Sequence, residues 1–138
     1  MAGTVKDIEK AIFEKPVAIL LFSDDSKLSS VFRDALNEIK ERHKGLLKDV
    51  SITEFANTTK ELDDFLSISW KPVIFFFLEG NLLLLYDLHY NAEIQTDPEK
   101  HKEDIKEQIL EALKSVVTFN GLISEILFDS ANQQAAVH

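Results

Sequence analysis

Two apolar runs on either side of a three-residue break dominate the pattern of hydrophobic and polar positions. The first run, 73–78, does not alternate between apolar and polar residues, and the second, 82–86, follows Glu79-Gly80-Asn81. Because glycine and asparagine tolerate a positive φ, this break can turn the chain back on itself. A strand that is apolar on both faces is usually covered by helices on both faces. The pattern therefore predicts an antiparallel hairpin at the centre of an α/β structure, with Pro72 just before its first strand.

Helices and strands alternate in the pattern that precedes the hairpin. In the expected helices, apolar residues recur at helical spacing after a capping residue. The expected strands between them are either continuous apolar runs or runs that contain both apolar and polar residues. The expected elements are a helix at 5–13, a strand at 17–22, a helix from the polar turn 23–26 to about 43, a strand at 46–52 and a short helix from about 58 to 66.

The region after the hairpin is expected to end in one more helix and a short extension. Residues 91–96 are interpreted as a loop, and Asp97-Pro98 is a strong start for a helix that runs to about residue 117. Asn120-Gly121 predicts a turn, and 122–128 a short strand. The chain is thus expected to form a single domain over 1–130, with 131–138 as a mobile tail.

Composition narrows the possible chemistry. The chain has 138 residues, no cysteine and a net charge of −9. The lack of cysteine excludes disulfides, thiolate metal sites and thiol catalysis, and the four scattered histidines show no ligand spacing, so no metal and no cofactor are expected. The charge argues against strong direct binding to RNA. No apolar run reaches the ~18 residues of a membrane span, so no membrane association is expected.

The order of elements resembles the thioredoxin fold. The strand 17–22 with its following helix is similar to the thioredoxin strand that leads into the redox helix, and 68–80 looks like the stretch that carries the cis-proline. The resemblance implies an α/β fold with a central mixed sheet, helices on both faces, a closing antiparallel hairpin and a C-terminal helix plus short extension. It also implies a cis Lys71–Pro72 bond.

The same resemblance implies that the redox centre is degenerate. Ser26 and Ser29 fall where thioredoxins carry two cysteines, and Leu20 falls where they carry a buried carboxylate. Serine has far too high a pKa to act as a thiolate and cannot form a disulfide. The preferred interpretation is that both serines are caps or solvated turn residues, and the alternative is an activated hydroxyl of the kind that some transferases of this fold use.

A narrower resemblance concerns the Dim-one family, the thioredoxin-like subunits of the spliceosomal tri-snRNP. Residues 8–12, 51–54 and 73–77 look like segments of that family. The resemblance implies a non-enzymatic, nuclear subunit that is monomeric alone and binds large protein scaffolds of a ribonucleoprotein complex. The alternatives are a redox-inactive adaptor or chaperone module outside splicing, in the cytoplasm, with peptide held near Pro72, and a serine-dependent enzyme of the glutathione type.

The second hairpin strand is the candidate binding face, because it is an edge strand and unusually apolar. The residues proposed to contact a partner are Trp70, Leu82, Leu84 and Tyr86. Two alternatives stay open. For the strand, the preferred alternative is that the last helix and the C-terminal segment cover it, so that it binds no partner. For Trp70, the side chain either contacts a bound peptide or only packs within its loop.

Overall fold

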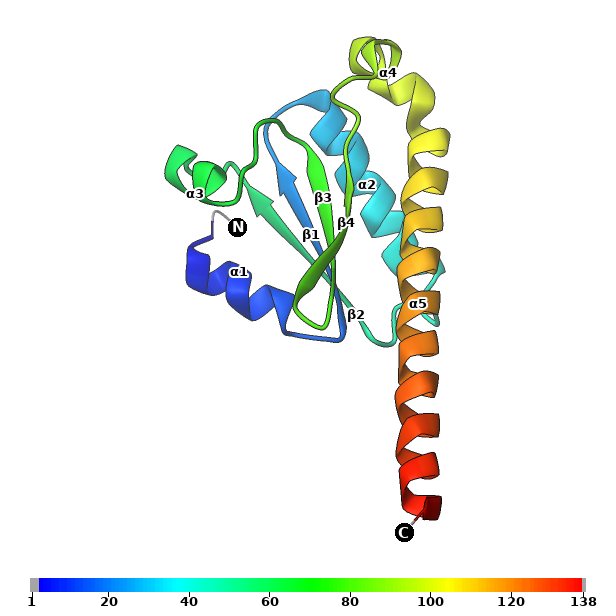
Figure 1. Cartoon of the computed structure of the whole chain (residues 1–138). Coiled ribbons are helices and arrows are strands. Elements are labelled where there is room, and N and C mark those ends of the chain that lie inside the picture. The colour runs from blue at the N-terminus through cyan, green and yellow to red at the C-terminus, as the bar shows by residue number, and fades with distance from the viewer. Residues whose placement is uncertain (1–2, 138) are drawn as a thin grey trace.

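A mixed four-stranded sheet forms the centre of the computed structural model, which describes residues 3–137 (Figure 1). The strands lie in the order β2-β1-β3-β4, and their bounds are β1 Val17–Ser23, β2 Val50–Ala56, β3 Val73–Leu78 and β4 Asn81–Tyr86. Strand β1 runs parallel to β2 and antiparallel to β3, which forms the expected antiparallel hairpin with β4. The hairpin and the mixed sheet confirm the predicted architecture.

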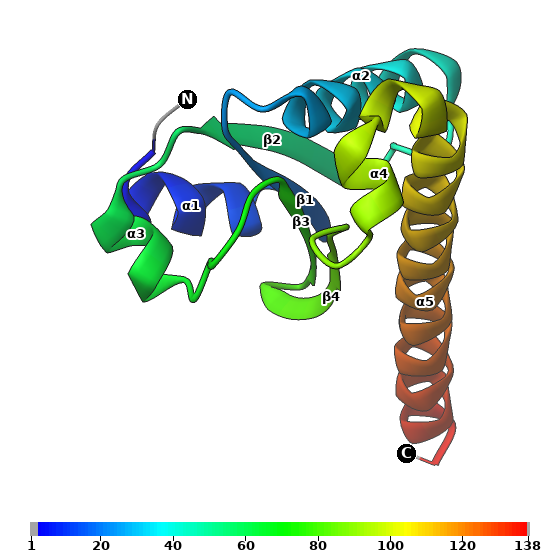
Figure 2. The same ribbon diagram turned by 90° about the horizontal axis from the view of Figure 1, so that it is seen from above.

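Helices cover both faces of the sheet (Figure 2). They are α1 Val5–Ile12, α2 Lys27–Arg42, α3 Lys60–Phe65, α4 Ala92–Thr96 and α5 Lys102–Val137, with a 3-10 helix at Pro98–His101. Helices α2 and α5 pack on one face, whereas α1 and α3 pack on the other. Each of the first four helices begins at a side-chain cap, and α1 has a complete capping box between Thr4 and Asp7.

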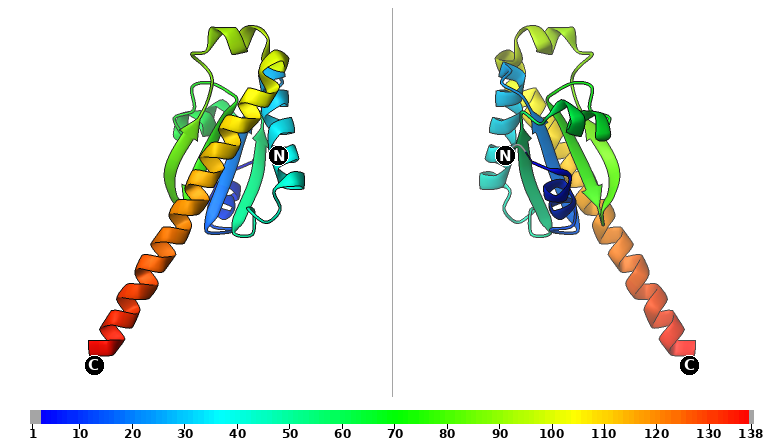
Figure 3. Two further views of the ribbon diagram at one scale, coloured as in Figure 1. Left: turned by 90° about the vertical axis from the view of Figure 1, so that its right-hand side faces the viewer. Right: turned by 90° about the vertical axis from the view of Figure 1, so that its left-hand side faces the viewer.

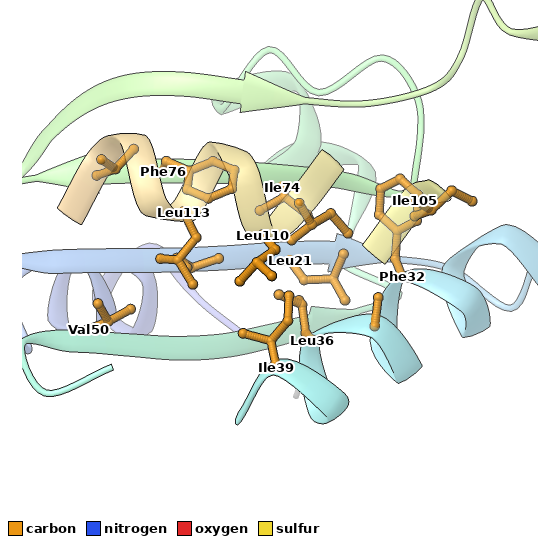
Figure 4. Close-up of a cluster of buried hydrophobic side chains, with 14 of the residues drawn as sticks. Leu21, Phe32, Leu36, Ile39, Val50, Ile74, Phe76, Ile105, Leu110 and Leu113 are labelled. Carbon is orange, nitrogen blue, oxygen red and sulfur yellow. The ribbon is translucent and has the colours of Figure 1, made fainter. Parts of the chain in front are cut away.

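The larger core lies between the sheet and the α2–α5 pair (Figure 4). Phe76 of β3, Phe32 of α2 and Leu113 of α5 are all fully buried in it. The smaller core, under α1 and α3, includes Leu20 and Phe22 of β1. All seven residues of β1 and all six of β3 are buried, which explains why neither run alternates in the sequence.

The turn of the hairpin is packed against the end of α1. Gly80 has a φ of +81°, and a Cβ atom at this position would overlap the ring of Phe13. Glycine is therefore favoured here by its backbone conformation, and the exposed ring of Phe13 lies close against it.

Two local predictions before the last helix are wrong. Strand β2 begins at Val50 rather than at residue 46, because residues 44–49 form turns, with the Val50 N–H donating to the Leu47 carbonyl. Residues 91–96 form the short helix α4 rather than a loop, because the Asn91 side chain caps it by accepting from the Ile94 N–H at 3.0 Å.

The prediction for the C-terminal region is also wrong. Helix α5 continues through Gly121 to Val137, so the predicted turn at 120–121 and strand at 122–128 do not form. A glycine inside a helix costs only about 1 kcal/mol, and the apolar residues around it recur at helical spacing. Residues 131–137, assigned from sequence to a tail, continue the helix, and residue 138 lies outside the described residues. Among the helices of residues 3–137, none is long and apolar enough to cross a membrane.

The central position of Phe76 makes a strong stability prediction. Because its ring is fully buried between the sheet and the helices, Phe76→Ala should lower the free energy of unfolding by about 3–5 kcal/mol through lost burial and a cavity. Urea denaturation followed by circular dichroism measures this change. Glu107→Ala, at an exposed position of α5, is the control and should stay within about 0.5 kcal/mol. A loss below about 1 kcal/mol for Phe76→Ala would contradict this description of the core.

Candidate functional site

The start of α2 is a closed network of hydrogen bonds. Ser29, which is fully buried, donates to the Asp24 carboxylate at 2.7 Å and accepts from the Asp24 N–H at 3.0 Å. Ser26 is the N-cap, and its hydroxyl accepts from the Ser29 N–H at 3.2 Å. The Ser26 N–H in turn donates to Asp24 at 3.0 Å. Ser26 therefore caps α2, as the preferred sequence interpretation expects, whereas Ser29 lies in the first turn of the helix and is buried, so it is neither a cap nor a solvated turn residue.

The environment of these serines does not favour an activated hydroxyl. Burial raises the pKa of Asp24, but hydrogen bonds from Ser26 and Ser29 outweigh it, so the pKa is lowered overall and the carboxyl is a weak base. Ser29 has no exposed surface through which a substrate could reach it. Leu20 is fully buried in the smaller core, so this position supplies no proton acceptor.

The cis-proline loop faces this network across a small hollow. The Lys71–Pro72 bond is cis, as the sequence predicts. The hollow, of about 310 Å³, is lined by Asp24, Asp63, Ile68, Ser69, Trp70 and Lys71. Lys71 forms an ion pair with Asp63 at 2.8 Å and donates to the Thr58 carbonyl at 3.4 Å. These contacts tie α3 to the loop, and the Lys71 charge is already paired within the hollow.

Trp70 packs within an aromatic cluster. Its ring stacks on His89 with 4.3 Å between centroids, and Tyr90 contacts both rings edge-on. Tyr90 is 84% exposed. The cluster joins the cis-proline loop to the segment after β4, so Trp70 does pack within its loop region, while it also lines a second hollow.

The second hollow, which we name the β4 groove, is apolar. It has a volume of about 200 Å³, and its walls include Leu66, Ile68, Trp70, Phe75, Leu82 and Leu85, with Asp87 at its rim. Leu82 and Leu85 are 51% and 49% exposed. Helix α3 has only six residues, and α5 lies on the opposite face of the sheet. The preferred expectation that the last helix and the C-terminal segment cover β4 is therefore wrong.

The predicted contact residues of β4 divide between the two faces of the sheet. A bulge between Phe76 and Phe77 shifts the register, so Leu82 lies beside Phe77 and Leu85 beside Phe75, on the α1 face. Leu84 lies beside Phe76 on the α5 face and is 38% exposed. Leu85 is not among the residues predicted from sequence, because simple alternation pairs Leu82 with Leu84 and nothing in the sequence marks the bulge.

Tyr86 belongs to the core rather than to the groove. Its hydroxyl donates to the Gln108 side chain at 2.6 Å, and its ring packs on Phe32 with 5.5 Å between centroids. Burial, together with the nearby Asp87 carboxylate, raises the pKa of Tyr86 well above its ordinary value. This side chain therefore fastens β4 to α2 and α5. Among residues 3–137, no cluster of three or more histidine or acidic side chains has the geometry of a metal site.

Solved structures with a similar fold include several thioredoxins. Thioredoxin from Trypanosoma brucei brucei matches with a TM-score of 0.55 and 10% identity, covering 80% of this chain and 87% of its own. A mutant thioredoxin from Halobacterium salinarum NRC-1 matches at 0.52 and 13%, covering 78% and 86%. Mitochondrial thioredoxin 3 from Saccharomyces cerevisiae matches at 0.50 and 12%, covering 72% and 89%. No protein-family model and no curated protein sequence matches the chain.

These similarities show the thioredoxin fold. Because the chain has no cysteine, it cannot carry out the dithiol chemistry of a redox thioredoxin. The protein is therefore a redox-inactive thioredoxin-like module.

The Asp24–Ser29 network predicts a pH-dependent stability difference. Ser29→Ala removes a buried donor and should destabilise the domain by about 1–3 kcal/mol at pH 7. The Asp24 pKa is lowered in the folded state, so its stabilising contribution is present above the unfolded value of about 3.9 and is lost as the pH falls through the folded value. The difference between wild type and variant should thus shrink in acid.

Urea denaturation from pH 7 down to about pH 2.5 measures this difference. Carbon-13 NMR of the Asp24 carboxyl should show a higher pKa in Ser29→Ala than in the wild type. Ser30→Ala, at the next position of α2, is the control and should leave the Asp24 pKa unchanged. A stability difference that stays constant with pH would contradict the role of the network.

Proposed function

We propose that this chain is a non-enzymatic protein-binding module that adds an extended segment of another protein to the outer edge of β4. The observation that carries the proposal is the exposed run Leu82–Leu85, each residue of which is 38–51% exposed on a strand at the end of the sheet. Apolar edge strands are normally blunted by charge, proline or a covering element, because they invite pairing with another chain.

Strand addition would use both the backbone and the groove. In the order β2-β1-β3-β4, the outer side of β4 has no strand to pair with in residues 3–137, so its N–H and C=O groups are free to pair with an incoming strand. Every second side chain of that strand would point toward Leu82 and Leu85 in the β4 groove. Apolar residues at these positions would bury the groove walls and give the interaction its specificity.

The opposite edge of the sheet is less suitable. On β2, Glu54 accepts hydrogen bonds from Arg33 of α2 at 2.9 and 2.7 Å and from Ser23 of β1 at 2.6 Å. These contacts place a charged, hydrogen-bonded side chain on that edge, which is one of the ways in which proteins protect edge strands. The β4 edge has no charged residue between Asn81 and Tyr86.

The charge of the chain supports a partner with basic flanks. Asp87 lies at the rim of the β4 groove, and the net charge is −9. An apolar segment with Lys or Arg at its ends would match this surface, and opposite charges would also speed association. The absence of a thiol and the closed Ser29 network support the view that binding, rather than catalysis, is the activity.

Within this class, we propose pre-mRNA splicing as the specific process. This assignment rests on the resemblance of residues 8–12, 51–54 and 73–77 to the Dim-one family. The partners would be large protein scaffolds of the tri-snRNP and the location nuclear. The second candidate is a cytoplasmic adaptor or chaperone that uses the same groove. The apolar β4 groove supports this candidate as well as it supports the splicing assignment.

A substitution in the groove tests the binding mode. We expect a synthetic peptide of alternating leucine and threonine, with lysine at both ends, to bind the wild-type chain. Leu85→Asp should weaken binding at least about tenfold, because it puts an unpaired carboxylate into the apolar contact. Fluorescence anisotropy with labelled peptide measures the affinity. Val5→Asp, 44% exposed on α1 and away from the groove, is the matched control. Equal affinities for the two variants would rule out this groove.

The splicing assignment has a separate test. The wild-type chain should co-purify with splicing proteins from its source cells and sediment with ribonucleoprotein particles, and Leu85→Asp should reduce this association. The isolated chain should bind RNA weakly at physiological salt because of its charge. Recovery of other partners through the same groove would leave the binding module in place and replace splicing with the adaptor candidate.

A further inference from the structure

The last part of α5 projects beyond the rest of the molecule. Figures 1 and 3 show the helix running past the edge of the sheet, with its red end away from the other elements. Residues 118–137 would span about 30 Å at 1.5 Å per residue. Isolated helices of this length are marginal in water, and most helical stability in proteins comes from packing of an apolar face.

The apolar face of α5 does not stop where the body ends. Its residues recur at alternating spacings of four and three, which is the heptad pattern of a coiled coil, at Ile105, Ile109, Ala112, Val116, Phe119, Ile123 and Ile126. Ile105, Ile109 and Val116 are buried against the body. Phe119 is 44% exposed and Ile126 63%, so the same stripe continues into solvent.

We propose that this exposed stripe binds a second copy of the chain. The stripe, named here the α5 seam, comprises the exposed residues Phe119, Leu122, Ile126 and Leu127, together with Ile123, which is half-buried and packs against the edge of the larger core. Two seams related by a twofold axis are self-complementary, since each copy presents the same apolar residues to the other. Ile126, which lies on this stripe and is 63% exposed, would face its equivalent in the second copy. This proposal is independent of the β4 groove, which lies elsewhere on the body.

The charge distribution favours a second copy over a lipid surface. Amphipathic helices that lie on membranes carry Lys and Arg on their polar face, whereas residues 118–137 contain neither. Of the two acidic residues of this segment, Glu125 lies away from the seam, and Asp129 lies at its edge, one heptad after Leu122. The centre of the contact, formed by Phe119 and Ile126, therefore contains no charge.

The area of the seam predicts a weak dimer. Each of its side chains can remove roughly 60–120 Å² of apolar surface from water, so the ten side chains of two copies remove roughly 600–1,200 Å². Stable interfaces bury about 1,200–2,000 Å², so this contact reaches at most the lower end of that range. The resemblance to the Dim-one family implies a monomer. Residues 122–128, which were expected to form a strand, continue a helix that exposes the seam.

The test is the mass of the full chain in sedimentation equilibrium from about 1 to 200 μM, a range chosen for weak association. The wild type should shift from monomer to dimer within this range. Ile126→Glu should raise the dissociation constant about 100-fold or more, because it puts a charge into the apolar contact. Phe128→Glu is the matched control: Phe128 is 66% exposed but lies about 200° around the helix from Ile126, and this variant should dimerise like the wild type.

Cross-linking gives a second readout. Because the chain has no cysteine, Ile126→Cys introduces a single exposed thiol that should form a disulfide-linked dimer on mild oxidation, whereas Phe128→Cys should not. A wild type that stays monomeric to about 200 μM would overturn the proposal, as would a dimer that Ile126→Glu leaves intact. Leu85→Asp should leave dimerisation unchanged, so that failure of the groove proposal is distinguishable from failure of this one.

Discussion

The burial of β1 and β3 on both faces is the constraint on which the rest of this structure depends. Two adjacent strands without a polar face can exist in water only if helices shield them on each side. The need for shielding explains why α2 and α5 meet over one face while α1 and α3 cover the other. It also explains why the chain keeps a thioredoxin fold with no redox centre, since packing of the two strands does not involve the positions of Ser26 and Ser29.

The helices cover the sheet unevenly, and this leaves two apolar surfaces of the molecule exposed. Helix α3 is too short to reach over β4, and α5 is longer than the body beneath it. A short helix leaves the β4 groove open, and a long helix leaves the α5 seam exposed. Apolar patches of this kind on soluble proteins usually mark contacts with other molecules. Both proposed contacts therefore arise from a mismatch in length between helices and sheet.

The sequence predicts most of the fold because its signals are local. Continuous apolar runs, Pro72 before β3 and Gly80 in the turn define the central hairpin, and the serine cap at Ser26 marks the start of α2. The sequence fails where two local signals compete. Asn120-Gly121 is typical of a turn, but the apolar residues on either side of it recur at helical spacing, and α5 continues through both residues. The bulge of the hairpin and the site residue Leu85 depend on pairing between strands, which no single stretch of sequence reports.

The contact between Gly80 and Phe13 has a consequence for binding entropy. A hairpin turn that is free to move would lose that freedom when a partner strand bound to β4, and the loss would subtract from affinity. Here the turn is held against the end of α1, while Tyr86 fastens the other end of β4 to Gln108. The edge strand is thus anchored at both ends before any partner arrives, so that most of its ordering cost belongs to the folding of the domain and not to the encounter.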